Sequence, residues 1–200
     1  MKRISIQEAK LNPNFISSWI INPPSLCDNL VDYFEFNQQK QNIGVLGGSG
    51  INTEVKDTTD IRIKPKELLL PGNHFFKEYF EKLFECHSDY IKQWPFLKDF
   101  CTKYEIGSFN LQKYKPGQHF KKVHTERASL SSLHRIFVFM TYLNDVDDGG
   151  STYFPHYDIE VKPRKGLTLI WPAEWTHAHR GNVLKTGLKY IITGWLHFSS

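Results

Sequence analysis

One apolar run, residues 135–143, constrains the fold of this 200-residue chain more than any other segment. It reads Arg-Ile-Phe-Val-Phe-Met-Thr-Tyr-Leu and is dominated by β-branched and aromatic side chains. Because apolar side chains occupy consecutive positions, both faces of a strand formed here are expected to be buried. The run therefore predicts a central strand of a β-sheet.

Other short segments of strand character lie on both sides of this run, and glycine and proline separate them. Short strands between frequent turns indicate an antiparallel sandwich or barrel. We expect these strands at residues 106–114, 151–154, 157–161, 167–171 and 189–198, with a turn at 144–150.

The first half of the chain carries two helical patterns instead. One follows Pro24-Ser25, and the other begins after Asn73, a candidate helix cap, and ends before Pro95. Apolar positions recur at roughly 3.6-residue spacing, so each helix has a face that can pack on a sheet. These positions are Leu26, Leu30, Tyr33 and Phe34 in the first helix and Phe75, Phe76, Tyr79, Phe80, Leu83 and Phe84 in the second.

We expect a single domain over residues 1–200, mainly β with flanking helices. Residues 1–104 would form a helical and loop support, and residues 105–200 the β core with the candidate site. A hydrophobic content of 40% suits a folded globule. The net charge of +4 is small and the basic residues are scattered, which disfavours nucleic-acid binding.

The N-terminal residues and the cysteines indicate the cellular compartment of the protein. Residues 1–5 lack the apolar stretch of a signal peptide, and no run reaches the ~18 apolar residues of a membrane helix. Cys27, Cys86 and Cys101 are odd in number and show no Cys-x-x-Cys spacing. This usage is typical of a reducing compartment, so we expect a cytoplasmic protein without membrane association.

Residues 44–50 form a glycine-rich connector. Such a loop can bind phosphate where a strand precedes it and a helix follows. Residues 51–63 are instead polar and strand-like, which favours a flexible loop. A lid over a substrate entrance and an inert surface loop are both compatible with this pattern.

His124 and Glu126 are candidate metal ligands, because side chains two apart in a strand share a face. Residues 175–179 offer two candidates for a third ligand, His177 and His179, which also share a face if extended. Two histidines and a carboxylate hold iron(II) while leaving other coordination positions open. An isolated His-x-Glu is also common without function, so these residues alone leave metal binding open.

Further motifs surround the candidate ligands in chain order. They are Tyr114-Lys115-Pro116-Gly117, Tyr142-Leu143-Asn144-Asp145-Val146, Gly149-Gly150-Ser151-Thr152-Tyr153-Phe154 and Lys189-Tyr190-Ile191-Ile192-Thr193-Gly194-Trp195. With these motifs, residues 106–198 resemble the prolyl 4-hydroxylase-like branch of the iron(II)/2-oxoglutarate dioxygenases. The resemblance implies a double-stranded β-helix (jelly-roll) core of two antiparallel sheets, supported by helices from the N-terminal half.

The resemblance makes His124, Glu126 and His179 the iron ligands and pairs Lys189 with the distal carboxylate of 2-oxoglutarate. The family's spacing between distal histidine and basic residue selects His179, ten positions before Lys189, over His177. His177 would then support a ligand or face the substrate. The family's usual carboxylate ligand is aspartate, so Glu126, one methylene longer, departs from the pattern.

The resemblance also places Tyr114, Tyr142 and Thr193 in the 2-oxoglutarate pocket, with Tyr142 reaching the distal carboxylate. Trp195 would pack beneath the site. For Tyr142 and Trp195, plain core packing is an equally good interpretation.

The activity implied is hydroxylation of an unactivated C–H bond with iron(II), 2-oxoglutarate and dioxygen, and ascorbate is a candidate additional cofactor. The substrate would be a prolyl residue of a peptide or protein, or a small molecule, and loops 44–65 and 127–134 would shape its entrance. The main alternative is a catalytically silent metal-binding β-barrel that acts as a binding or sensing module. A cupin-like zinc or manganese barrel is a third interpretation, which would not explain Lys189 and Tyr142 together.

Overall fold

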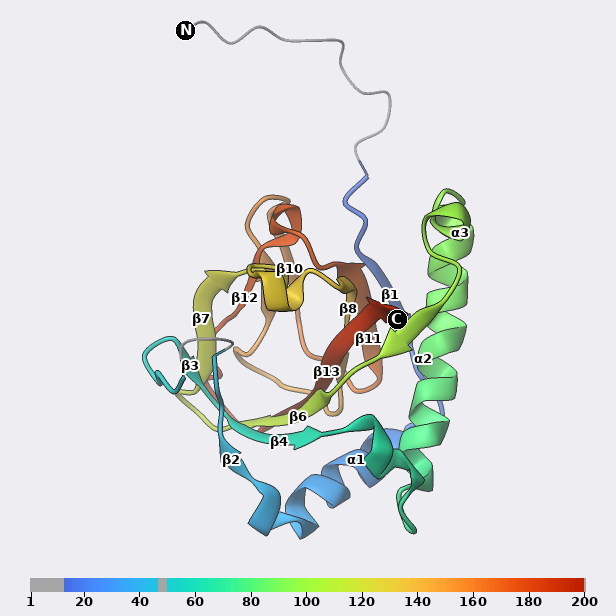
Figure 1. The fold of residues 1–200 in the computed structure, drawn as a ribbon. Coiled ribbons are helices and arrows are strands. Elements are labelled where there is room, and N and C mark those ends of the chain that lie inside the picture. Colours follow the sequence, from blue (N-terminus) through green and yellow to red (C-terminus); the bar gives the residue numbers. More distant parts are fainter. Residues whose placement is uncertain (1–12, 47–49, 200) are drawn as a thin grey trace, which may run out of the picture.

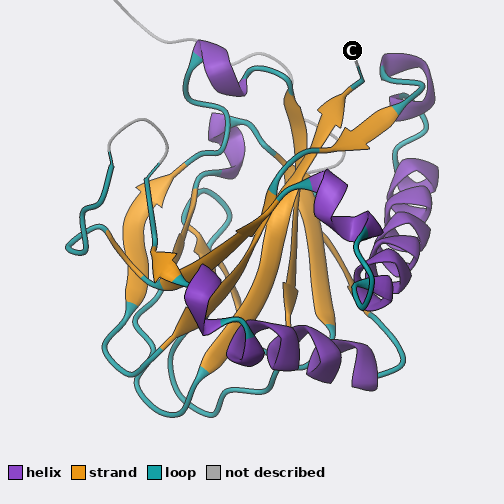
Figure 2. Cartoon of the chain, turned by 60° about the horizontal axis from the view of Figure 1, so that its bottom comes forward, coloured by secondary structure: helices purple, strands orange, loops and turns teal. Residues whose placement is uncertain are grey.

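A computed structural model describes residues 13–46 and 50–199 of the chain. Two antiparallel β-sheets face each other, and helices cover the outer face of the larger sheet (Figures 1 and 2). The expected mainly β fold with two sheets and flanking helices is confirmed. Residues 1–5 and the middle of the glycine-rich connector, residues 47–49, lie outside the described residues.

The larger sheet has eight strands and the smaller sheet five. The larger contains β1 (Ser17–Ile20), β2 (Asn42–Ile43), β4 (Thr59–Ile63), β5 (Tyr104–Ile106), β6 (Phe109–Tyr114), β8 (Arg135–Tyr142), β11 (Leu167–Pro172) and β13 (Lys189–Phe198). The smaller contains β3 (Lys56–Asp57), β7 (His119–His124), β9 (Thr152–Phe154), β10 (Ile159–Val161) and β12 (His179–Gly181). Their orders are β1-β11-β8-β13-β6-β4-β2, with β5 also on β13, and β10-β9-β12-β7-β3.

Helices α1 (Ser25–Phe36) and α2 (His74–Gln93) pack on the larger sheet and bury most of the apolar positions expected from the sequence. The described residues also contain the short helix α3 (Leu97–Phe100) and the 3-10 turns η1 (Gln38–Lys40), η2 (Pro65–Leu69), η3 (Leu130–Ser132) and η4 (Trp175–His177). Leu30 and Phe34 of α1 and Phe76 and Leu83 of α2 are fully buried in one core with the sheet. None of the helices in the described part of the chain is long and apolar enough to cross a membrane.

Strand β8 lies between β11 and β13, as its sequence predicts for a central strand. Successive side chains of a strand point to opposite faces. Phe137 and Phe139 accordingly belong to the core beneath the helices, whereas Val138 and Met140 belong to a second core between the two sheets. Strand β13 alternates in the same way. The side chains that it directs between the sheets are Lys189, Ile191, Thr193 and Trp195.

The first half of the chain also contributes strands to both sheets. Strand β1 pairs with β11 at one edge of the larger sheet. Strands β3 and β4, within the segment expected to be polar and strand-like, are separated only by Thr58 but join different sheets. Strand β3 pairs with β7 and β4 pairs with β6, so this short segment links the two sheets.

Three local expectations differ from the structure. The expected strand at 106–114 is interrupted, since β5 ends at Ile106 and β6 begins at Phe109. Gly107 lies between them, and a Cβ there would lie 2.3 Å from Cε1 of the His197 ring. Asn73 occupies the cap position of α2, but its side chain donates to the backbone oxygen of Glu67 and does not cap the helix. Phe84 is 37% exposed, since it lies at the edge of the apolar stripe and not within the core.

Gly194 should be intolerant of any side chain. A Cβ at this position in β13 would lie 2.7 Å from Phe139 Cζ and 2.8 Å from Phe109 Cβ. We expect Gly194→Ala to lower the free energy of unfolding by about 2 kcal/mol in urea denaturation, because a packed core resists added volume. Gly181→Ala is the control, since its Cβ would meet Phe120 atoms only at 3.6 Å or more. Equal effects of the two substitutions would contradict this account.

Candidate metal centre

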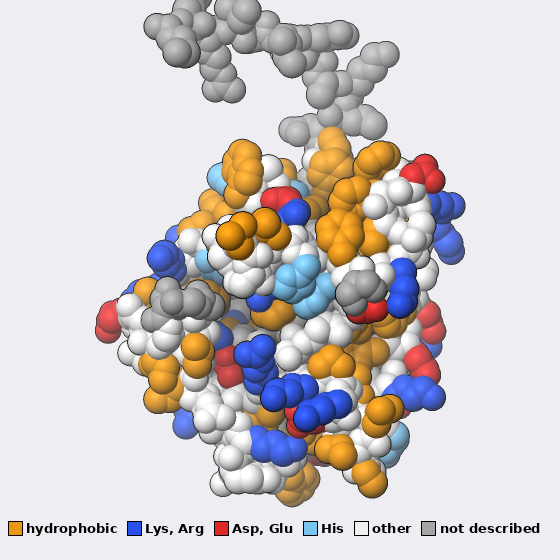
Figure 3. Space-filling model, in the orientation of Figure 1, with side chains coloured by type: hydrophobic (Ala, Val, Ile, Leu, Met, Phe, Trp, Pro, Cys, Tyr) orange, Lys and Arg blue, Asp and Glu red, His pale blue; other side chains and the backbone are white. Residues whose placement is uncertain are grey.

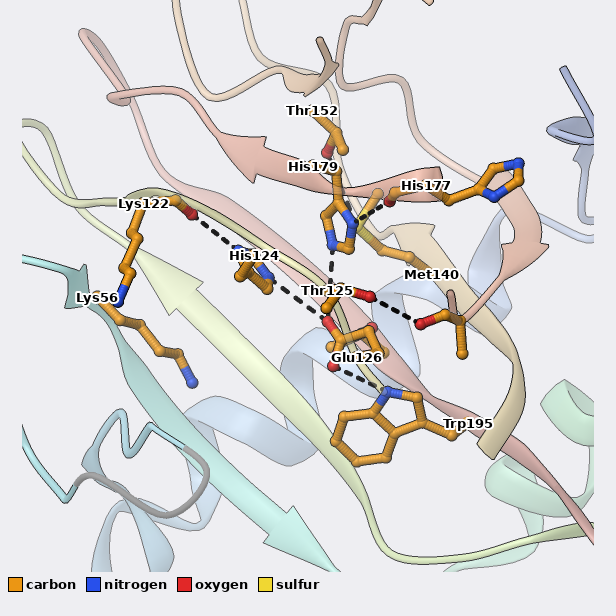
Figure 4. Close-up of polar contacts among 12 residues, drawn as sticks. Lys56, Lys122, His124, Thr125, Glu126, Met140, Thr152, His177, His179 and Trp195 are labelled. Atoms are coloured by element: carbon orange, nitrogen blue, oxygen red, sulfur yellow. Dashed lines mark hydrogen bonds and ion pairs between the residues drawn. The ribbon is translucent and has the colours of Figure 1, made fainter. Parts of the chain in front are cut away.

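Three donor atoms from His124, Glu126 and His179 converge between the sheets (Figure 4). Strands β7 and β12 are paired with His124 directly opposite His179, so their ring centroids lie 4.5 Å apart. Glu126 Oε1 lies 3.4 Å from His124 Nε2 and 3.6 Å from His179 Nε2. All three ligand atoms lie within 4.8 Å of one another, which suits one metal ion.

Glu126 reaches this cluster in a way that the sequence did not indicate. Strand β7 ends at His124, so the expectation that His124 and Glu126 project from one strand is wrong. The chain bends after the strand, and Thr125 Oγ1 donates to the backbone oxygen of Ala173, 2.9 Å away. This anchor on the neighbouring segment turns the Glu126 carboxylate toward the histidines.

Backbone carbonyls fix the protonation of both imidazole rings. His124 Nδ1 lies 2.8 Å from the Lys122 oxygen, and His179 Nδ1 lies 3.0 Å from the His177 oxygen. Because a carbonyl oxygen can only accept, each Nδ1 carries the proton and each Nε2 keeps its lone pair. Metal-binding histidines use this arrangement, and here both lone pairs face Glu126.

The electrostatics also suit a cation. Burial raises the pKa of Glu126, but the proximity of the His124 and His179 rings and of the Arg135 guanidinium lowers it to about 2 overall. Burial, followed by the proximity of His124, lowers the pKa of His179 to about 4. At neutral pH Glu126 is therefore anionic and His179 is neutral, so protons compete little with a metal ion.

His177 lies apart from this cluster. It belongs to η4 and not to an extended segment, so it does not share a face with His179. Its Nε2 donates to the backbone oxygen of Asn14 at 2.8 Å, and Tyr157 Oη lies 3.3 Å from the same nitrogen. Its ring points away from Glu126 in Figure 4. The structure thus brings His179, and not His177, to the other two candidate ligands.

Lys189 is buried between the sheets with only 2% of its surface exposed. It pairs with Tyr114 across β13 and β6, and its Nζ lies 3.9 Å from the centre of the Tyr114 ring. Nζ donates to the Gly150 oxygen at 2.9 Å. Within the described residues no carboxylate forms a salt bridge with it, and burial lowers its pKa to about 7. A buried cation of this kind is suited to an anionic ligand.

Gly150, from the expected glycine turn, permits the close approach of Lys189. It has a positive φ of 68°, and a Cβ there would lie 3.1 Å from Lys189 Cδ.

The hydroxyl groups of Tyr142 and Thr193, which were expected in the co-substrate pocket, form hydrogen bonds with other groups of the protein. Tyr142 Oη donates to the Val161 oxygen at 3.1 Å and lies 2.6 Å from Thr152 Oγ1, and Thr193 Oγ1 donates to the Phe139 oxygen.

A buried polar network behind Tyr114 was not anticipated. Tyr114 Oη donates to Gln112 Oε1, and Gln112 Nε2 donates to Asp60 Oδ2 at 3.2 Å. Lys56 Nζ lies 2.6 Å from the same Asp60 oxygen, and Thr58 donates to the other. Charged residues in a short strand are usually solvent-exposed, so no sequence signal distinguishes Lys56 and Asp60 from surface residues.

Two side-chain contacts on the far side of Glu126 were not anticipated, although Trp195 was expected to pack beneath the site. Trp195 Nε1 donates to Glu126 Oε2 at 3.0 Å, and Arg135 donates to the backbone oxygen of Glu126 at 2.8 Å. The sequence presents Arg135 as one of several scattered basic residues and Trp195 as a packing residue.

Comparisons with known sequences point to one family. Residues 109–197 match the profile of the 2OG-Fe(II) oxygenase superfamily. Probable prolyl 4-hydroxylase 9 of Arabidopsis thaliana is 30% identical over 115 residues, which cover 44% of this chain and 40% of that protein. Prolyl 4-hydroxylase subunit alpha-1 of Gallus gallus is 24% identical over 156 residues, which cover 74% and 24%, respectively. The chain spans less than half the length of the curated relatives it matches.

Solved structures share the fold. The 2OG complex of a viral collagen prolyl hydroxylase from Paramecium Bursaria Chlorella virus-1 has a TM-score of 0.65 at 18% identity, covering 92% of this chain and 97% of that chain. A Trichoplax adhaerens prolyl hydroxylase, in complex with a hypoxia inducible factor oxygen degradation domain peptide fragment, has a TM-score of 0.70 at 14% identity, covering 92% and 84%. Residues 109–197, which carry the candidate ligands, thus match the 2OG-Fe(II) oxygenase superfamily and are similar in sequence to prolyl 4-hydroxylases, and the chain shares the double-stranded β-helix fold of these prolyl hydroxylase structures.

Proposed function

We propose that this chain is an iron(II)- and 2-oxoglutarate-dependent dioxygenase that hydroxylates an unactivated C–H bond. His124, Glu126 and His179 would hold the iron, and Lys189 would bind the distal carboxylate of 2-oxoglutarate. The observation that carries the proposal is the coexistence of two features between the sheets. One is a ligand set with both Nε2 lone pairs free, and the other is a buried lysine that has no carboxylate partner among residues 13–46 and 50–199.

The donor set fits iron(II), since two imidazole nitrogens and one carboxylate oxygen leave coordination positions open for co-substrate and dioxygen. When bound, the iron would activate dioxygen using electrons from the decarboxylation of 2-oxoglutarate to succinate. The protein's part is to orient the ligands and to exclude water. The backbone carbonyls of Lys122 and His177 would fix the orientation of the two imidazole rings. The hydrophobic core between the sheets would exclude water from the site.

Lys189 would neutralise the distal carboxylate, because a buried dicarboxylate needs a charge partner. Its Nζ has one contact to a carbonyl oxygen, from Gly150, and an ammonium group can donate two further hydrogen bonds. The Tyr114 ring would line the same pocket and stabilise the ammonium group. In this proposal Tyr142 and Thr193 shape the pocket wall around the co-substrate.

The substrate that we propose is a prolyl residue of a peptide or protein. The matched relatives are named as prolyl 4-hydroxylases, and the Trichoplax structure contains a peptide fragment. The loop that follows Glu126 offers an apolar surface, since Leu130 is 87% and Leu133 47% exposed. On the face drawn in Figure 3, hydrophobic side chains gather over the upper part, and Lys and Arg gather below.

The proposed location is the cytoplasm. Cys27, Cys86 and Cys101 are all free thiols, which is typical of proteins from a reducing compartment. Reducing conditions would also keep iron in its ferrous state.

We also propose ascorbate as an additional cofactor.

The distal histidine is tested by a matched pair of variants. Anaerobic addition of 2-oxoglutarate to the iron(II)-loaded protein should produce a weak visible charge-transfer band. We expect His179→Ala to lose this band and succinate formation, because it removes one of the three ligands. His177→Ala should keep both, since His177 bonds to the Asn14 oxygen.

The opposite pattern would assign the ligand role to His177. No band in metal-loaded wild-type protein would contradict the dioxygenase and favour a catalytically silent binding barrel.

Co-substrate binding is tested at Lys189. We expect Lys189→Met to weaken 2-oxoglutarate binding at least tenfold, because a buried carboxylate would lose its charge partner. Metal affinity should stay near the wild-type value. Isothermal titration with 2-oxoglutarate, under anaerobic conditions and with the metal bound, measures the first effect. Lys185→Met, at a lysine with 65% side-chain exposure, is the control. An unchanged co-substrate affinity in Lys189→Met would remove Lys189 from the site.

Burial of Lys189 also predicts a pH dependence of stability. Its folded pKa is about 7, whereas an unfolded lysine titrates near ~10.4. The unfolded chain therefore binds more protons between these values, so this residue makes the free energy of unfolding rise with pH across that window. Without co-substrate, Lys189→Met should be more stable than wild type at pH values of about 6.5, on the order of a few kcal/mol, and lose most of this gain by about 9.5. Urea unfolding at both values checks this, and a gain independent of pH would contradict it.

A further inference from the structure

Glu126 is held from two sides. Its Oε1 faces His124 Nε2 and His179 Nε2 at 3.4 and 3.6 Å. Its Oε2 points the other way and accepts a hydrogen bond from Trp195 Nε1 at 3.0 Å, drawn in Figure 4. The two oxygens of one carboxylate are thus divided between the ligand cluster and the indole.

Arg135 fixes the same arrangement from behind. Its guanidinium carbon lies 3.6 Å from the centre of the Trp195 ring, a stacking distance. Its Nη1 donates to the Glu126 backbone oxygen at 2.8 Å and lies 3.5 Å from Oε2. Arg135 therefore holds both the backbone of Glu126 and the ring that binds its side chain.

We infer that Trp195 and Arg135 are positioning residues that make a glutamate the carboxylate ligand of this metal site. The inference rests on the proposed function, because it takes Glu126 to be a ligand. By occupying Oε2, the pair leaves Oε1 as the single oxygen that faces the metal. Glutamate fits because its extra methylene lets one carboxylate reach both the histidines and the indole.

An aspartate in place of Glu126 is a C–C bond shorter. With its backbone held by Arg135 and by the Thr125 anchor, its carboxylate cannot reach both the histidines and Trp195. The residue that the family normally uses should therefore bind metal less tightly in this chain than Glu126 does. In the Glu126→Asp variant, the indole N–H of Trp195 should no longer contribute to metal affinity.

A double-mutant cycle tests this inference by anaerobic titration with cobalt(II) as the probe, without turnover. Trp195→Phe keeps an aromatic ring and removes the N–H donor. We expect it to weaken cobalt affinity by about tenfold, the lower end of losses seen when a supporting contact to a metal ligand is removed. Glu126→Asp should also weaken binding. Adding Trp195→Phe to Glu126→Asp should cause little further loss, since the two changes remove the same interaction.

Trp171→Phe is the control for packing. Trp171 is fully buried in the same core and lies 5.1 Å from the His179 ring, but its Nε1 has no hydrogen-bond partner within the described residues. The Trp171→Phe substitution should weaken cobalt binding much less than Trp195→Phe does. Circular dichroism and urea unfolding of each variant confirm that the titrated protein is folded. Arg135→Lys, which keeps the charge but loses the planar stack, should weaken binding in the same direction as Trp195→Phe.

The outcomes separate the inference from the proposed function. No cobalt binding by the wild-type chain would overturn both. Wild-type binding with unchanged affinity in Trp195→Phe, or equal losses from Trp195→Phe in the wild-type and Glu126→Asp backgrounds, would overturn only the positioning role. Equal losses in Trp171→Phe and Trp195→Phe would assign the effect to packing and also overturn it. Unchanged affinity in Arg135→Lys would remove Arg135 from the inference.

Discussion

The pairing of β7 with β12 is the interaction on which the candidate site depends. It places His124 opposite His179, and the carbonyls of Lys122 and His177, two residues before each histidine, then orient the two rings. Edge strands β3 and β10 and the larger sheet beneath hold this pair in place. Because backbone hydrogen bonds orient both histidines, the candidate ligands are pre-organised by the fold itself.

Within the described residues, the buried carboxylates of Asp60 and Glu126 both have a cationic neighbour. Asp60 is paired with Lys56, and Glu126 faces Arg135. Lys189 instead has a carbonyl and an aromatic ring, although burying an unpaired charge is costly. In the proposed function, this arrangement lowers the stability of the protein but keeps the site ready for an anionic ligand, and it distinguishes Lys189 from the other buried charges around it.

The match to the 2OG-Fe(II) oxygenase superfamily covers the candidate ligands but not all of their surroundings. The matched region begins at Phe109, so the β3–β4 segment with Lys56 and Asp60 lies outside it. That segment nevertheless links the two sheets and, through Gln112, reaches the Tyr114 hydroxyl. The first half of this chain thus supports Tyr114, whose ring lies beside Lys189, in addition to covering the sheet with helices.

The sequence by itself determined the central strand at residues 135–143, the two long helices and, through the family resemblance, the residues that gather between the sheets. These features follow from local periodicity and chain-order motifs, which each segment carries alone. Only the tertiary structure shows why His177 lies apart from the cluster, because its partner is Asn14, 163 positions away. The bend at Glu126 likewise depends on Ala173, and Gly107 lies against His197, both distant residues whose proximity no periodicity reports.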